Sequence, residues 1–339
     1  MRFNPPAHQY IDRDSARVAT ERLIADPFIN RLYARSKEDP SLLFKAVTSL
    51  RMSAILGFLN FDLPLPGRQQ ATRNRIRSMG IDISECLDDP MALDTPRKLF
   101  ERKIRYWQCR PMPECENRIV SPADARMIAG SFDQNDSLFL KEKFFSFEEL
   151  LGKDKPPWLR AFENGDFAIF RLTPDKYHYN HLPVSGRVID IYEISGRCHS
   201  CNPGAVVSMV TPFSKNRRVV TIIDTDVPGG SGIGLVAMIE IVAMMIGDIL
   251  QCYSTHGYDD PLDIAPDMFL ERGCPKSLYR PGSSVDVLIF QPHRMVFADD
   301  ILANMRRRDV TSRYTLHFQS PLVETDVRVR SEIGRNAHS

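Results

Sequence analysis

The feature that most constrains the fold is a change near residue 95, from a helical pattern to a succession of short strand-like runs. These runs are rich in β-branched and apolar residues and are bounded by Pro, Gly, Asn or Asp, as is typical of strands joined by turns. They cover residues 118–121, 167–172, 187–192, 218–223, 235–241 and 285–290. The pattern predicts a mainly antiparallel β domain that follows an amino-terminal helical region, so the expected fold class is α+β.

The helical pattern extends over residues 14–63 and again over residues 69–79. It is clearest at residues 42–61, where apolar side chains recur every three or four residues and would form one face of a helix. Two interpretations of this face stay open. It packs against the protein's own core, or it lies among lipid headgroups at a membrane surface.

A polar stretch at residues 84–96 is interpreted as a linker, which divides the chain into a helical region, 1–95, and a β domain, 96–339. The net charge of +1 does not favour a chain that coats nucleic acid. No stretch approaches the roughly 20 uncharged apolar residues of a membrane-spanning helix, and no apolar signal segment follows the amino terminus. Seven scattered cysteines predict reduced thiols. We therefore expect a cytoplasmic protein that meets a membrane only at its surface.

Three short patterns suggest sites but are interpreted as structural. Residues 198–201 form a single CxxC without the second ligand pair that a zinc site needs, and no metal is expected. The glycine-rich residues 228–234 lack the Lys-Ser/Thr ending of a phosphate loop and predict a hairpin connection. The three arginines at 306–308 are expected to form a solvated patch able to contact anionic headgroups.

Three segments far apart in the sequence supply an acid, two imidazoles and a hydroxyl. The first contains Asp124 just after a proline-marked turn, the second contains His178 and His181, and the third contains Ser283 in a turn that precedes a strand. Asp, His and Ser are the components of a hydroxyl activated by a base, in which the carboxylate orients the imidazole. Each residue alone is a weak signal, and only the three segments together point to this chemistry.

In their order and flanking residues, these segments resemble the phosphatidylserine decarboxylase family. The run at 171–186 is similar to the family's most specific motif, which carries two histidines followed by proline and glycine. Gly282-Ser-Ser occupies the place of the family's Gly-Ser-Thr processing site. Further resemblances lie at 95–102, 109–113, 120–124, 144–152, 213–218 and 245–247. They follow the family's order over roughly residues 95–290.

The resemblance implies a self-processing proenzyme in which Asp124, His181 and Ser283 form the catalytic triad. Ser283 would attack the Gly282 carbonyl, and elimination followed by hydrolysis would leave a pyruvoyl cofactor in place of Ser283. The products would be two associated fragments of one chain, 1–282 and 283–339. The pyruvoyl group is the electron acceptor that no side chain provides for loss of CO2 from an α-amino acid. His178 would either contact the phosphate or carboxylate of the substrate or support its own strand through a hydrogen bond.

The family implies decarboxylation of phosphatidylserine, a phospholipid substrate, to phosphatidylethanolamine and CO2 by an enzyme peripherally associated with the membrane. One alternative is a related pyruvoyl-dependent decarboxylase of a soluble amino acid. Another is an unprocessed homologue that only binds lipid through its amino-terminal helices. The oligomeric state stays open, and a homodimer is compatible with the sequence.

Three residues depart from the family pattern. Ala125 replaces a glycine, so the turn after Asp124 is expected to avoid a positive φ angle. Pro281 precedes the scissile Gly282 and restricts the approach of the chain to it. Val242 replaces another glycine and is expected to narrow the substrate pocket.

Overall fold

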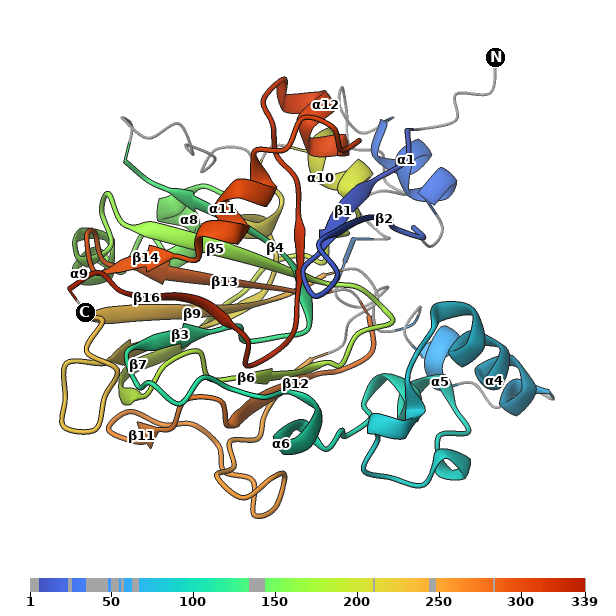
Figure 1. Ribbon diagram of the computed structural model, residues 1–339, viewed down its shortest axis with the longest axis horizontal. Helices are drawn as coiled ribbons and strands as arrows, with labels where there is room; N and C mark the ends of the chain where they lie inside the picture. Colours follow the sequence, from blue (N-terminus) through green and yellow to red (C-terminus); the bar gives the residue numbers. More distant parts are fainter. Residues whose placement is uncertain are drawn as a thin grey trace.

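The computed structural model describes residues 6–23, 26–34, 48, 49, 55, 58–62, 67–133, 144–209, 211–243, 248–282 and 284–338. Within these residues a β-rich body carries a helical projection on one side, formed by residues 67–105 (Figure 1). The strands are β1 Gln9–Asp12, β2 Arg17–Thr20, β3 Arg118–Val120, β4 Ala125–Ser131, β5 Asp166–Leu172, β6 Tyr179–His181, β7 Gly186–Ile194, β8 Arg218–Asp224, β9 Leu235–Val242, β10 Ile249–Gln251, β11 Phe269–Leu270, β12 Pro275–Tyr279, β13 Ser284–Phe290, β14 Met295–Phe297, β15 Thr325–Val327 and β16 Glu332–Asn336. The helices are α1 Asp26–Ala34, α4 Arg68–Met79, α5 Pro96–Phe100, α6 Tyr106–Cys109, α8 Phe147–Leu151, α9 Pro156–Ala161, α10 Pro203–Ser208, α11 Asp299–Met305 and α12 Arg313–Phe318.

The body is built around a ten-stranded sheet of order β11-β7-β8-β9-β13-β5-β4-β15-β1-β2. Two smaller sheets, β10-β12-β6 and β14-β16-β3, accompany it. Every residue of β13 is buried, so both faces of the large sheet are covered at its centre. One hydrophobic cluster joins the central strands to residues of both smaller sheets, including Ile119, Tyr279 and Ile333.

The predicted fold class is confirmed, since mostly antiparallel strands make up the body and each of the six predicted strand runs forms a strand. β-branched residues dominate these runs because their side chains pack well on a pleated surface. The glycine-rich residues 228–234 connect the antiparallel neighbours β8 and β9, as predicted. Cys198 and Cys201 form no disulfide bond among the described residues and lie in the loop before α10, where the Asn202 side chain accepts the Gly204 N–H.

The amino terminus differs from its prediction. Residues 9–20 form the antiparallel hairpin β1–β2, and the helix predicted from residue 14 is wrong over residues 17–20. Strand β1 lies parallel to β15, with Ile11 paired to Thr325. A partner strand some 300 residues away along the chain therefore overrides the local pattern, as tertiary context often does for a weak propensity.

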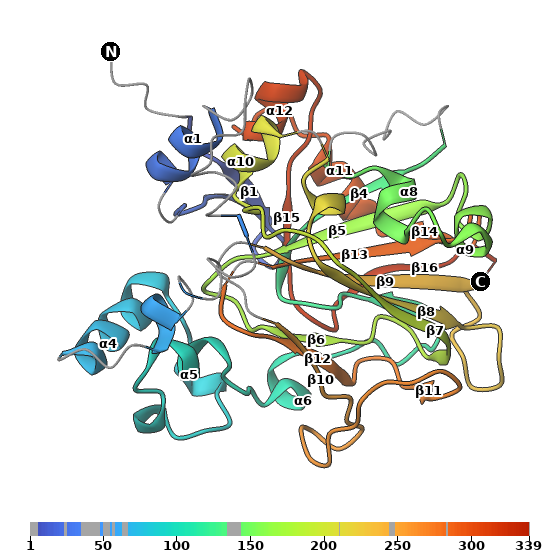
Figure 2. The same cartoon turned by 180° about the vertical axis from the view of Figure 1, so that it is seen from behind.

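The helical projection contains α4, which confirms the helix predicted at 69–79. Most of the helix predicted at 42–61 lies outside the described residues, which there include 58–62, a short π-helical turn. The Phe61 ring packs edge-on against Phe100 of α5, 5.9 Å between ring centroids. Residues 84–96, interpreted as a linker, instead contain short 3-10 helical turns. Cys86 and Leu93, which follow these turns, pack with Leu99 in a small hydrophobic cluster. Figure 2 shows this projection from behind, beside α6 and the β10–β12–β6 sheet.

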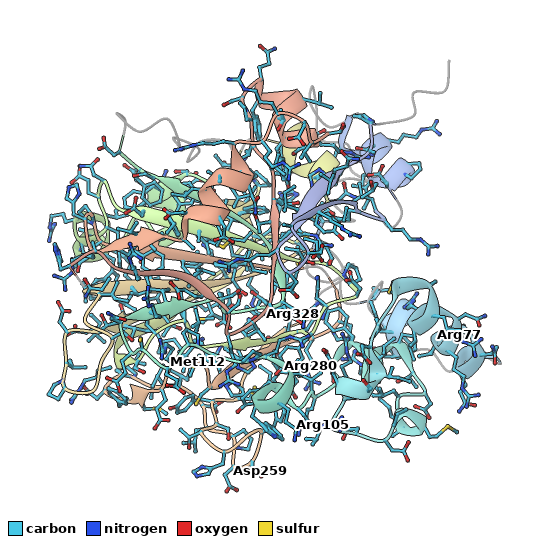
Figure 3. The ribbon with its side chains drawn as sticks, viewed as in Figure 1. Arg77, Arg105, Met112, Asp259, Arg280 and Arg328 are labelled. Atoms are coloured by element: carbon cyan, nitrogen blue, oxygen red, sulfur yellow. The ribbon has the colours of Figure 1, made fainter. Side chains whose placement is uncertain are left out.

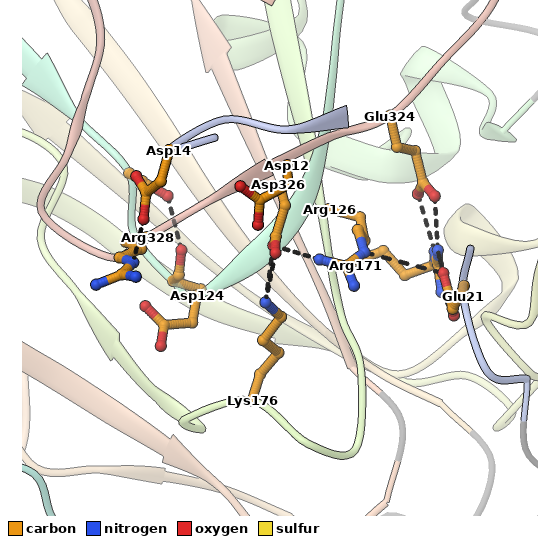
Figure 4. Close-up of polar contacts among 12 residues, drawn as sticks. Asp12, Asp14, Glu21, Asp124, Arg126, Arg171, Lys176, Glu324, Asp326 and Arg328 are labelled. Carbon is orange, nitrogen blue, oxygen red and sulfur yellow. Dashed lines mark hydrogen bonds and ion pairs between the residues drawn. The ribbon is translucent and has the colours of Figure 1, made fainter. Parts of the chain in front are cut away.

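A buried charge network ties the amino-terminal hairpin to the body (Figure 4). The guanidinium of Arg171 donates to both carboxylate oxygens of Glu21, at 2.9 and 2.6 Å, and to both of Glu324, at 2.9 and 2.6 Å. His8 Nε2 lies 2.7 Å from Glu324. His8, Glu21 and Glu324 thus gather atoms of the type that bind metals. Because Arg171 already supplies positive charge to both carboxylates, this cluster acts as a structural ion network.

Among the described residues, none of the helices combines the length and apolar character that crossing a bilayer requires.

Candidate active site

The second and third predicted site segments lie on paired strands. β6 pairs antiparallel with β12, with Tyr179 opposite Leu278, and the Tyr279 N–H donates to the His178 carbonyl at 3.1 Å. β12 is followed by residues 280–283 and then by β13. The predicted cleavage turn therefore begins beside the two histidines.

The first segment is held against the second by two backbone hydrogen bonds. The His181 N–H donates to the Pro122 carbonyl at 2.7 Å, and the Val120 N–H donates to the Pro183 carbonyl at 3.0 Å. Asp124 follows Pro122 by two residues and is 5% exposed. Ala125 begins β4 in extended backbone, so the turn avoids a positive φ as predicted.

Asp124 is fixed by an arginine that the sequence did not single out as a site residue. Arg110 Nε donates to Asp124 Oδ1 at 3.0 Å and Arg110 Nη2 donates to Oδ2 at 2.8 Å. The Val329 N–H adds a third bond to Oδ1 at 2.8 Å. Burial alone would raise the pKa of Asp124, but the charge and hydrogen bonds of Arg110 hold that pKa below its ordinary value. Asp124 is therefore ionised at neutral pH.

Arg110 also binds the helical projection, through two bonds to the Glu85 carboxylate at 2.8 and 2.9 Å. A polar cavity of about 210 Å³ adjoins these three residues and is also lined by Lys176 and Arg328. Figure 4 shows Asp124 close to Asp14 and Arg328. The acid thus lies where the hairpin, the projection and the β body meet.

His181 is a neutral base with a defined tautomer. Its Nδ1 lies 2.8 Å from the Gly273 carbonyl oxygen, which can only accept, so Nδ1 carries the hydrogen. Nε2 is then unprotonated and lies 2.9 Å from the Tyr177 hydroxyl, which in turn lies 2.8 Å from the Tyr258 hydroxyl. Burial lowers the pKa of His181 to about 3, although the charge of Asp124 acts in the opposite direction. Nε2 therefore carries the lone pair that can accept a hydroxyl proton, and here the Tyr177 hydroxyl donates to it.

The carboxylate–imidazole hydrogen bond expected from the sequence is not formed between the described side chains of Asp124 and His181. Asp124 binds Arg110 and the Val329 backbone, while His181 binds Gly273 and Tyr177. The two side chains interact through space, because the negative charge of Asp124 favours the charged imidazole. Asp124 thus acts on the base electrostatically in this arrangement.

His178 is fully buried and its ring stacks on Phe100, with 3.6 Å between ring centroids. Among the described residues neither ring nitrogen makes a hydrogen bond of standard geometry, although the Lys176 backbone lies close enough to favour the charged form. Burial, the dominant effect, lowers the pKa of His178 to about 3. The His178 ring is therefore neutral and retains hydrogen-bonding capacity.

The predicted cleavage turn is described on both sides of Ser283, which itself lies outside the described residues. Gly282 has a φ of 154°, a value that L side chains rarely adopt. Ser284 is the first residue of β13, is buried, and pairs with Val242 on β9. Val242 therefore lies one strand away from the predicted site of the cofactor.

Sequence reasoning missed several residues that shape the site. Arg110 belongs to the Arg-Pro motif at 109–113, and Tyr177 directly precedes His178, so their motifs offered a signal. Tyr258 and Val329 lie in segments without any motif, and only the fold brings them to the site.

The fold brings the predicted acid, base and cleavage-turn segments onto adjoining strands of a β-rich body. The family model for phosphatidylserine decarboxylase matches residues 97–308. A phosphatidylserine decarboxylase proenzyme of Fusobacterium nucleatum is 27% identical over 307 residues, which cover 90% of this chain and 95% of that protein. A proenzyme of the same name from Bordetella petrii is 30% identical over 237 residues, 66% of this chain and 78% of the relative. A phosphatidylserine decarboxylase proenzyme 2 of Oryza sativa is 32% identical over 231 residues, 67% of this chain and 34% of the relative. The chain belongs to the phosphatidylserine decarboxylase family.

Proposed function

We propose that this protein is a carboxy-lyase that converts phosphatidylserine to phosphatidylethanolamine and CO2 after cutting its own chain between Gly282 and Ser283. The observation that carries the proposal is the neutral imidazole of His181, whose basic Nε2 lies on β6, beside the strand that enters the cleavage turn. Membership of the family supports the choice of substrate.

In the processing step, the Ser283 hydroxyl oxygen would bond to the Gly282 carbonyl carbon. The amide C–N bond would break, its nitrogen would gain the hydroxyl proton, and an ester would join the two residues. Loss of the proton on Cα of residue 283 would then expel the Gly282 carboxylate and leave dehydroalanine. One water would release ammonia and complete the pyruvoyl group. His181 Nε2 is the candidate base, and the ionised Asp124 favours the imidazolium formed in passing.

The start of β13 suits a pyruvoyl group at position 283. The buried Ser284 hydroxyl has no hydrogen-bond partner among the described residues, so a donor is available beside that position. When formed, the pyruvoyl group would supply the conjugated carbonyl that accepts the electrons released with CO2. His178 has free hydrogen-bonding capacity and is the candidate contact for the substrate's phosphate or carboxylate.

The helical projection, most of which belongs to the amino-terminal region 1–95, supports a peripheral membrane surface, with the cytoplasm as the compartment of the protein. The β1–β2 hairpin of that region belongs to the large sheet instead. Leu87 and Met91 of the projection are 43% and 64% exposed. Other exposed apolar side chains lie outside the projection, at Ile55, Phe58, Trp107, Leu250, Leu262, Val296 and Leu316. Helix α4 carries arginines and no acidic residue, and Figure 3 shows Arg77 at the outer end of the projection. Arg105 and Arg280 lie where the projection meets the body (Figure 3). Exposed apolar and basic side chains together favour a surface rich in anionic phospholipid.

The two fragments would stay associated after cleavage. β13, from the carboxyl-terminal fragment, lies between β9 and β5, and β15 lies between β4 and β1. Separating the fragments would therefore open the large sheet at its centre.

Intact-mass analysis of freshly prepared protein tests the proposal. Wild type should give two masses, the smaller one with a carbonyl-blocked terminus, and Ser283→Ala should give one. CO2 release should be observed with phosphatidylserine vesicles, be abolished by borohydride, and be negligible with free serine. An active preparation consisting of one full-length polypeptide would refute self-processing, and turnover of free serine alone would refute the lipid substrate.

A further inference from the structure

The cleavage turn is the short connection between two different sheets. β12 belongs to the sheet β10-β12-β6, whereas β13 lies at the centre of the ten-stranded sheet. Only residues 280–283 join them. Whatever fixes the end of β12 relative to the start of β13 therefore fixes the geometry of the bond between Gly282 and Ser283.

A side-chain contact spans this turn. The hydroxyl of Tyr279, the last residue of β12, lies 2.7 Å from Asp286 Oδ1 and 3.0 Å from the Val285 carbonyl oxygen, both on β13. It also accepts the Ile241 N–H from β9 at 3.0 Å. Tyr279 and Asp286 are both fully buried. The hydroxyl thus connects β12 to two central strands of the large sheet.

The number of hydrogens in this contact indicates that Asp286 is protonated. The Tyr279 hydroxyl has one hydrogen but lies within bonding distance of two acceptors, Asp286 Oδ1 and the Val285 carbonyl. A proton on Asp286 supplies the missing hydrogen, so that Tyr279 donates to Val285 and accepts from Asp286.

The surroundings favour that proton. Asp286 pairs across the strands with Glu240 of β9, a second fully buried acid. Among the described residues, Lys276 is the cation that contacts this pair, and its Nζ donates to Glu240 Oε2 at 2.6 Å. Asp286 Oδ2 has no hydrogen-bond partner there, as expected of a neutral carboxyl rather than a carboxylate. Burial, followed by the charge of Glu240, raises the pKa of Asp286 well above its ordinary value.

We propose that Tyr279 and Asp286 are positioning residues for self-cleavage, forming a hydrogen-bonded clamp that holds both ends of the cleavage turn. The clamp spans the bond that is cut, with Tyr279 three residues before Gly282 and Asp286 three residues after Ser283. It restricts where the Gly282 carbonyl can lie relative to the next residue's hydroxyl, which is the distance that governs attack. The inference rests on the proposed function, because a chain that does not cut itself needs no such positioning.

The clamp also bears on the cleaved protein. After the cut, Tyr279 lies near the end of the first fragment and Asp286 near the head of the second, so their bond joins the two fragments next to the cofactor. Pyruvoyl at position 283 would then keep a fixed place although one of its covalent anchors has gone.

The test measures the half-time of cleavage of newly synthesised full-length chain, by cell-free translation and gel or mass analysis at fixed intervals. Tyr279→Phe keeps the ring and removes the hydroxyl. Asp286→Leu removes the polar partner, while Asp286→Asn keeps a group shaped like the neutral acid. Tyr33→Phe is the matched control, since Tyr33 is buried and its hydroxyl accepts the Ser200 N–H. Each change is repeated with Ser283→Ala to measure thermal stability on an uncut chain.

Tyr279→Phe and Asp286→Leu should lengthen the half-time by about ten- to a hundredfold, the range expected when a reacting group is misplaced by about 1 Å. Asp286→Asn should restore cleavage to within about threefold of wild type, and Tyr33→Phe should leave the half-time unchanged. Equal half-times for Tyr279→Phe and Tyr33→Phe, at matched stability, would overturn the clamp. Wild type that stays uncut would instead overturn the proposed function, so the two failures are distinguishable.

Discussion

Replacing Lys276 by methionine should destabilise the protein in a way that depends on pH. Lys276 Nζ lies 2.6 Å from Glu240 Oε2, and both side chains are fully buried. Two unit charges about 3 Å apart attract by about 5–6 kcal/mol at an effective dielectric constant of about 20. Methionine keeps most of the side-chain volume and removes the charge. Glu240 then keeps neutral donors from Ser277, Asn180 and Gln251.

The penalty is limited because Glu240 can take up a proton. For a carboxyl with an ordinary pKa of about 4.3, protonation costs about 3.7 kcal/mol at pH 7 and about 1 kcal/mol at pH 5. The loss of unfolding free energy should therefore be about 3–4 kcal/mol at pH 7. In wild type, burial acts to raise the pKa of Glu240, but Lys276 holds that pKa below its ordinary value. In the variant the pKa of Glu240 should be raised above its ordinary value instead. The unfolding free energy of the variant should therefore be highest at low pH and should fall as pH rises.

The assay is urea unfolding at pH 5, 6, 7 and 8, in a Ser283→Ala background so that a single uncut chain unfolds. The difference between wild type and Lys276→Met should shrink by about 1.4 kcal/mol for each unit of pH lowered from 7 to 5. Adding Glu240→Gln should remove this pH dependence. Lys153→Met, at a lysine whose side chain is 67% exposed, is the control and should leave stability unchanged. A difference below about 1 kcal/mol that does not vary with pH would refute the account of a desolvated ion pair.

Three further outcomes follow from the site and the charge network. Cleavage half-times should not lengthen between pH 8 and pH 5, because the pKa of His181 lies near 3; a rate that falls tenfold per unit below pH 6.5 would contradict this. Asp124→Asn should slow cleavage by about a hundredfold or more, since it removes the charge that favours imidazolium and leaves Arg110 without that partner, as a gel time course would show. Arg171→Met should lower the unfolding free energy by about 3–5 kcal/mol by leaving Glu324 without its main cation; a loss under 1 kcal/mol in urea unfolding would refute the network's role.

The strands were predictable because their information is local. Runs such as 218–223 and 285–290 are β-branched, short and bounded by turn residues, so the residues themselves favour the structure they adopt. The hairpin at 9–20 was not predictable in this way. Its first strand pairs with β15, which lies near the other end of the chain. The residue pattern within a short stretch of sequence carries no information about such a distant partner.

The proximity of the motif segments was predictable from the sequence, but the contacts of their side chains were not. Asp124 and His181 belong to motifs that the fold brings together, as the backbone bond from His181 to Pro122 shows. Their direct contact could not be assessed from sequence, because the position of Arg110 depends on how the helical projection folds back against the body. A carboxylate binds the strongest donor within reach, and a guanidinium with two aligned N–H groups is a stronger partner than a neutral imidazole.

The burial of a charged residue within a strand cannot be predicted from the alternation of polar and apolar residues alone. In the run 284–290, Asp286 alternates with apolar residues, which would place it on a solvated face. The large sheet is covered on both faces there, so Asp286 and its neighbour Glu240 are buried and need partners. Those partners, Tyr279 and Lys276, come from a strand of another sheet.

This placement bears on the proposed cleavage between Gly282 and Ser283. Apolar contacts between β12 and the large sheet would tolerate a small shift of the strand, because their energy depends little on direction. A shift of one residue here would leave the Lys276 ammonium and the Glu240 carboxylate buried apart, at a cost of about 3–5 kcal/mol. The polar contacts therefore favour one position of β12 more strongly than hydrophobic packing could. They act on the strand that leads into the predicted cleavage turn. Under the proposed self-cleavage they would fix the position of the bond between Gly282 and Ser283, and they would still hold β12 after that bond is cut.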